Sequence, residues 1–153
     1  MRILKSLLIT ILTISMFTGC QTYQSYTFNL ETEEQIKVEL DTTGGEKLSQ
    51  EDGRFIISSN EGEEVSIGLF YLGEPFNQLY NTVDKLEGVE IIEVQDKEQP
   101  EYIFYSAESE SATEYNYLVK FDGTESGVVV SNITSEESAK AAFELLDFEV
   151  NQN

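Results

Sequence analysis

Apolar residues recur with two different periods along this chain, and the alternation of the two periods limits the folds it can adopt. In short blocks every second residue is apolar, as where Ile36, Val38 and Leu40 alternate with charged neighbours. A period of two is typical of a β-strand with one buried face. Polar turns separate the blocks. The pattern predicts strands at 26–30, 36–40, 54–58, 65–72, 89–94, 101–106, 113–121 and 127–132.

Two other segments have the spacing of an amphipathic helix. The first follows Pro75, which suits the first turn of a helix, and ends near Gly88, a typical stop. The second begins with the capping-box spacing at 134–137. Its apolar side carries Ala139, Ala142, Phe143 and Leu146.

This order of strands and helices predicts an α+β fold. We expect a mainly antiparallel sheet of about six to seven strands, with two amphipathic helices packed on it, as a single globular domain at 36–150. The element order over residues 36–148 resembles the PsbP and Mog1-like fold, in which helices cover a central antiparallel sheet and which also occurs in small bacterial lipoproteins. The resemblance is one of element order, so it implies a fold and assigns no functional residue.

The charge of the chain excludes one large class of partner. Its 153 residues include 29 acidic and 9 basic residues, for a formal net charge of -20. Proteins that bind nucleic acids need a basic face, so we predict no nucleic-acid partner. The chain also has no histidine and a single cysteine, Cys20, which cannot form an internal disulfide.

The first twenty residues have the features of an export signal. Arg2 and Lys5 precede an uncharged and largely apolar run at 6–17. Together they match the two opening regions of a secretory signal peptide. The run is about twelve residues long, whereas a membrane-spanning helix needs roughly 20. We therefore expect residues 1–19 to be a cleaved signal peptide.

The end of this segment resembles a known modification signal. Phe17-Thr18-Gly19-Cys20 resembles the lipobox of bacterial lipoproteins, although Phe17 stands where that family usually has leucine. The resemblance implies cleavage between Gly19 and Cys20 and attachment of acyl chains such as palmitate to Cys20. The polar composition of 21–35 predicts that 20–35 is the lipidated cysteine and its tether. Two acyl chains suffice for stable anchoring. An ordinary signal peptide, or an uncleaved anchor beside a chance cysteine, is the alternative.

Catalytic and metal-binding motifs are hard to find in this sequence. Serine-hydrolase and phosphate-binding motifs are missing, and without histidine neither a His-based triad nor the usual zinc site can form. Acidic segments such as 61–64 and 108–110 could supply oxygen ligands to calcium, which is the alternative interpretation, but they lack the EF-hand spacing. We therefore predict no enzyme, no catalytic residue, no metal and no cofactor, and we interpret the acidic segments as loops that keep the domain soluble.

Aromatic residues suggest one candidate binding surface. Tyr102, Tyr115 and Tyr117 lie at period two on two neighbouring predicted strands, together with Phe104 and Phe121. Rings that share one face could form a binding platform, because tyrosine combines a large contact area with a polar tip. The alternative is that this face packs beneath the helices.

Two hypotheses of function arise from these observations. The first is a lipid-anchored lipoprotein on the extracytoplasmic side of the cell membrane. It would act as a non-catalytic binding or accessory module of the cell envelope, and its partners would be the membrane, through Cys20, and an envelope or secreted protein. The second is a lipid-tethered hydrolase of a cell-wall or sugar substrate that uses paired carboxylates, since glycosidases need only two suitably placed acids.

Overall fold

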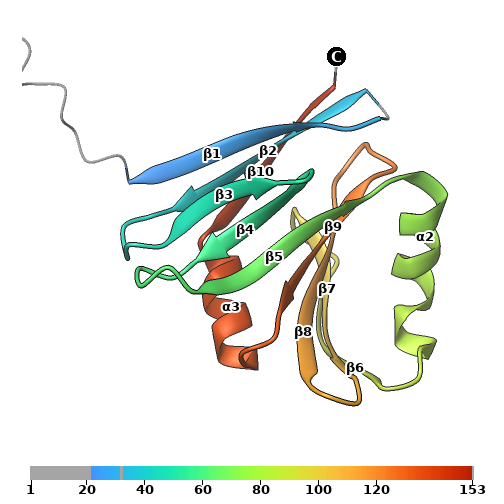
Figure 1. Ribbon diagram of the computed structural model, residues 1–153. Coiled ribbons are helices and arrows are strands. Elements are labelled where there is room, and N and C mark those ends of the chain that lie inside the picture. The colour runs from blue at the N-terminus through green and yellow to red at the C-terminus, as the bar shows by residue number, and fades with distance from the viewer. Residues whose placement is uncertain (1–21, 32, 153) are drawn as a thin grey trace, which may run out of the picture.

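The computed structural model describes residues 22–31 and 33–152, which form two antiparallel sheets and two α-helices (Figure 1). The larger sheet has seven strands in the order β3-β4-β5-β9-β8-β7-β6, and the smaller has three in the order β1-β2-β10. The predicted α+β class with mainly antiparallel strands is thus confirmed. Neither helix has the length and apolar character needed to cross a membrane, among the residues described.

The elements succeed one another along the chain with short connections. The strands are β1 Tyr23–Asn29, β2 Glu34–Asp41, β3 Lys47–Glu51, β4 Arg54–Ser58, β5 Glu64–Tyr71, β6 Val89–Gln95, β7 Glu101–Glu108, β8 Thr113–Lys120, β9 Gly127–Asn132 and β10 Leu146–Gln152. The helices are α2 Gly73–Thr82 and α3 Glu136–Glu144, and a 3-10 turn, η1 Val83–Lys85, comes after α2.

The described residues contain ten strands, more than the six to seven expected, and two of them, β3 and β10, match none of the predicted strand ranges. Helix α3 stops at Glu144, and Leu146, which the helical spacing places on its apolar side, begins β10 instead. Strand β3 buries a single apolar residue, Leu48, so its sequence has no alternation to detect. β1 and the start of β2 lie within 20–35, the range expected to be a tether.

The smaller sheet joins the two ends of the described chain. Strand β2 lies at its centre and pairs with β1 on one side and β10 on the other. Alternate residues of β2 are fully buried, so its inner face belongs to the core. Their partners in β10 are apolar too, with Leu146 opposite Leu40, Phe148 opposite Val38 and Val150 opposite Ile36.

The seven-stranded sheet is covered differently on its two faces, and α2 and α3 lie on opposite sides of it (Figure 1). On one side α3 and the three-stranded sheet share one large apolar core, to which α3 contributes Ala139 and Ala142. On the other side α2 and η1 cover a smaller cluster with Phe76 and Val83. The strands that contribute apolar residues to this smaller cluster are β6, β7, β8 and β9.

One phenylalanine lies where the two sheets meet. Phe55 of β4 is fully buried, and its ring centre lies 6.0 to 6.3 Å from those of Phe28 in β1, Phe70 in β5 and Phe148 in β10. The ring fits over Gly68, because a Cβ atom there would stand 2.0 Å from Cζ of Phe55. Glycine at position 68 therefore gives the ring its space.

Asn132 fixes the start of α3. Its side-chain oxygen accepts hydrogen bonds from the backbone N–H groups of Thr134 (2.8 Å) and Ser135 (3.3 Å). Its amide nitrogen donates to the hydroxyl groups of Ser66 and Ser138, each at 3.1 Å. Ser135 is the N-cap and accepts a bond from the Ser138 N–H, so α3 begins one residue after the start that the predicted capping box gives, in which Thr134 would be the N-cap. This buried amide thus ties α3 to β5.

Replacing Phe55 with alanine should strongly destabilise the protein. The truncation would leave a cavity between the sheets, and such changes typically cost about 3 to 5 kcal/mol. The same truncation at the exposed Leu86, Leu86→Ala, should cost less than about 1 kcal/mol and serves as the control. Urea denaturation monitored by circular dichroism measures both. An equal loss of unfolding free energy in Phe55→Ala and Leu86→Ala would contradict the role given to Phe55.

Candidate functional site

The aromatic residues predicted as a binding platform lie together but beneath a helix. The Tyr117 ring is 4% exposed and stacks between Phe104 and Phe143 of α3, with ring centres 4.2 and 3.8 Å away. Tyr102 lies edge-on to Tyr117 and Phe143, at 5.3 Å from each, and its hydroxyl donates to Glu93 Oε1 at 2.8 Å. Tyr115 is partly buried against the same core. The structure therefore arranges these rings as core packing and not as an open platform.

The other predicted site lies outside the described residues. Gly19 and Cys20, the expected cleavage and lipidation positions, precede Thr22, where the description begins. The first strand starts a short distance further along the chain, since β1 begins at Tyr23. Across residues 22–31 and 33–152, no group of three or more acidic side chains is arranged to hold a metal ion.

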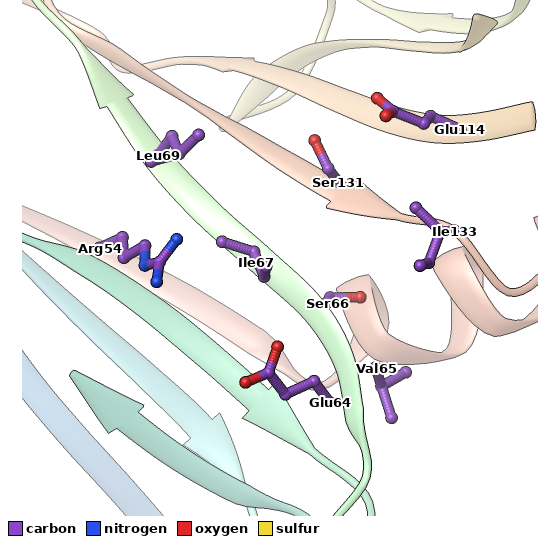
Figure 2. Close-up of a pocket in the computed structure, with 9 residues that line it drawn as sticks. All are labelled: Arg54, Glu64, Val65, Ser66, Ile67, Leu69, Glu114, Ser131 and Ile133. Atoms are coloured by element: carbon purple, nitrogen blue, oxygen red, sulfur yellow. The ribbon is translucent and has the colours of Figure 1, made fainter. Parts of the chain in front are cut away.

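A groove opens on the face of the seven-stranded sheet that carries α2, at the part nearest β5. Its cavity volume is about 310 Å³, at the lower end of the roughly 300 to 1,000 Å³ typical of ligand pockets. Figure 2 shows the nine residues that line it, which come from β4, β5, β8, β9 and the segment after β9. They are Arg54, Glu64, Val65, Ser66, Ile67, Leu69, Glu114, Ser131 and Ile133.

The strand pleat of β5 gives the groove its apolar floor. Successive side chains point to opposite faces of a sheet. Because Gly68 faces Phe55 and the core, Ile67 and Leu69 point the other way, into the groove (Figure 2). Leu69 is 42% exposed and Ile133, just beyond β9, is 70% exposed. Large apolar side chains are therefore in contact with water on this face.

Two carboxylates border this apolar floor. Glu64 comes from β5 and Glu114 from β8, and β9 lies between those strands (Figure 2). The one basic residue among those lining the groove is Arg54, whose Nη2 atom lies 3.2 Å from Glu51 Oε2. Since Arg54 already has a carboxylate neighbour, the groove has a negative rim.

A polar row leads from the groove into the smaller core. Ser131 of β9 donates its hydroxyl to the Asn116 side-chain oxygen, and Asn116 lies opposite Tyr105 of β7. Tyr105 is buried, and this burial, together with the nearby Tyr71 and Glu114, raises its pKa to about 12. Its hydroxyl group therefore remains protonated over the physiological pH range.

The period of two in the predicted strand 65–72 puts Val65, Ile67, Leu69 and Tyr71 on one of its faces, but the sequence does not single out this groove. The pattern is that of a strand with one buried face, and we expected helices to cover the sheet. In the structure, α2 covers the neighbouring strands and leaves the β5 part of the face open. Of the nine residues that line the groove, the predicted face contained Val65, Ile67 and Leu69, and their exposure was not predicted.

Comparison with other proteins gives no further assignment. No protein-family model, curated protein or solved structure matches this chain. The resemblance to the PsbP and Mog1-like fold stays a prediction from element order.

Stability should fall at alkaline pH because of the buried tyrosines. A tyrosine has a pKa near 10 in an unfolded chain, whereas that of Tyr105 is raised to about 12. Between about pH 10 and 12 the unfolded state loses this proton first. Below about pH 10 the contribution of Tyr105 to stability is fully present. Between about pH 10 and 12 the free energy of unfolding should therefore fall by up to roughly 1.4 kcal/mol per pH unit.

The variant Tyr105→Phe isolates this effect, because it keeps the ring and removes the ionising group. Urea unfolding measured from pH 8 to 12 should show a shallower alkaline loss in this variant than in the native protein. Tyr23→Phe, at an exposed ring of β1, should leave the slope unchanged. An unchanged slope in Tyr105→Phe would contradict the prediction.

Proposed function

We propose that this protein is a lipid-anchored extracytoplasmic lipoprotein, which acts as a non-catalytic binding or accessory module at the cell envelope. The observation that carries the proposal is the position of Cys20, the single cysteine, directly after an apolar run and a small residue. The start of β1 at Tyr23 supports it, because three residues span at most about 11 Å. Acyl chains on Cys20 would hold the domain close to the membrane surface.

The distribution of charge supports a lipid as the anchor. Arg2 and Lys5 precede Cys20, so all 29 acidic residues but only seven of the nine basic residues come after it. Anionic lipid headgroups repel such a domain, which gives it no electrostatic attraction to a membrane. At physiological salt this repulsion fades beyond about 8 Å. Attachment would therefore depend on the acyl chains.

The groove on β5 supports a binding role. It combines an exposed apolar floor with a charged rim, as protein-binding surfaces commonly do. On the same side of the sheet, α2 and its apolar cluster cover residues of β6, β7, β8 and β9. The groove is thus the surface through which we expect this module to contact its partner.

Lipidation is testable in cells that express the full chain. Labelled palmitate should enter the native protein, and Cys20→Ala should abolish the label and release the protein to the medium or leave it unprocessed. As a matched control, a double variant with Cys20→Ala and Ser25→Cys restores a thiol on the exposed β1 strand and should remain unlabelled. Labelling that survives Cys20→Ala would contradict the proposal.

The alternative, a hydrolase with paired carboxylates, now has one specific pair to test. Glu64 and Glu114 line the same groove from two different strands. A binding module predicts no turnover of cell-wall fragments or glycosides by the purified protein, with or without Glu64→Gln and Glu114→Gln. Product formation that disappears in both variants, while the fold remains intact by circular dichroism, would favour the hydrolase.

A further inference from the structure

We propose that the groove along β5 binds a segment of a partner protein in which aliphatic side chains stand next to lysine or arginine. This inference rests on the proposed binding role and names the chemistry of the partner. It is independent of the lipid anchor. The apolar floor, the acidic rim and the overall charge of the domain each contribute to it.

The floor favours aliphatic side chains over a polar ligand. Ile67, Leu69 and Ile133 line the groove, and the last two are exposed by 42% and 70%. Tyr71, the next residue on the same face of β5, is also exposed. Covering this surface removes apolar area from water, which favours binding. A volume of about 310 Å³ has room for a few side chains and not for a folded element.

The rim favours a cation beside those aliphatic groups. Glu64 and Glu114 face the groove, while the guanidinium of Arg54 is held by Glu51 on the neighbouring strand β3. A docked apolar segment would reduce the hydration of both carboxylates, which is costly unless positive charges replace the water. Lysine and arginine suit this position, because their aliphatic stems can cover Leu69 while their charged ends reach the carboxylates.

The same charges disfavour a second copy of this chain as the occupant. In a symmetric dimer the same patch meets itself, so the rim carboxylates of the two copies would face each other. The 29 acidic residues beyond Cys20, against seven basic ones, add a general repulsion between copies. Like charges brought together at an interface disfavour association. The groove therefore fits a basic partner better than itself.

Synthetic peptides provide the probe. The purified full-length protein, in neutral detergent and about 0.15 M salt, would be titrated with three fluorescent heptapeptides and binding measured by anisotropy. They are Lys-Leu-Lys-Leu-Lys-Leu-Lys, its serine analogue Lys-Ser-Lys-Ser-Lys-Ser-Lys, and the acidic peptide Glu-Leu-Glu-Leu-Glu-Leu-Glu. The lysine-leucine peptide should bind roughly tenfold or more tightly than the lysine-serine peptide, and the acidic peptide should not bind.

Matched variants locate the binding. Leu69→Ser should weaken binding of the lysine-leucine peptide about fivefold or more. Val94→Ser, at a residue of β6 that is 54% exposed, should leave binding unchanged. The double variant Glu64→Gln and Glu114→Gln should also weaken binding. Glu87→Gln and Glu144→Gln together remove the same charge at exposed positions away from the groove and should have less than about a twofold effect.

Three results would overturn the proposal. The first is equal binding of the lysine-leucine and lysine-serine peptides. The second is an equal loss of affinity for the lysine-leucine peptide in the two double variants. Either result would show that general attraction to an acidic surface explains the binding. A dimer in the native protein that Leu69→Ser dissociates would assign the groove to a second copy. The Cys20→Ala protein should still discriminate among the peptides, so failure of lipidation and failure of the groove are separable.

Discussion

The packing of the Phe55 ring over Gly68 is the contact on which the rest of this structure depends. The ring occupies the space that a side chain at position 68 would need, and it lies beside phenylalanines from β1, β5 and β10. Strands β1 and β10 come from the two ends of the described chain and meet only through β2. The three-stranded sheet therefore depends on this contact to dock on the larger sheet, and the docked sheet buries one face of β4 and β5.

The open groove is a consequence of this arrangement of layers. The buried face of the larger sheet is shared by α3 and the small sheet, so only α2 remains to cover the opposite face. Seven strands about 4.8 Å apart are roughly 29 Å wide. The ten residues of α2 make a helix only about 15 Å long and 10 Å thick. One such helix cannot cover the face, and the strands that it leaves uncovered include β5.

Local patterns predicted most strands and both helices, because each depends on its own period of apolar residues. They failed where a distant partner decides the outcome. Ala139, Ala142, Phe143 and Leu146 fit a helical spacing, but Leu146 and Phe148 also alternate, and pairing with β2 makes them a strand. The face of β5 with Ile67 and Leu69 has the larger apolar side chains, yet the face with Gly68 is the buried one. The choice between faces depends on Phe55 in another strand, which no local pattern contains.

The acidic rim of the groove contributes to specificity more than to affinity. In the free protein Glu64 and Glu114 are exposed, so water solvates both carboxylates. A neutral apolar segment would gain from covering Leu69 and Ile133, but it would also remove water from two carboxylates without compensation. A segment with lysine or arginine replaces that water with opposite charge. The rim thus discriminates by charge between partners of equal hydrophobicity. The same carboxylates disfavour binding of another copy of this acidic domain.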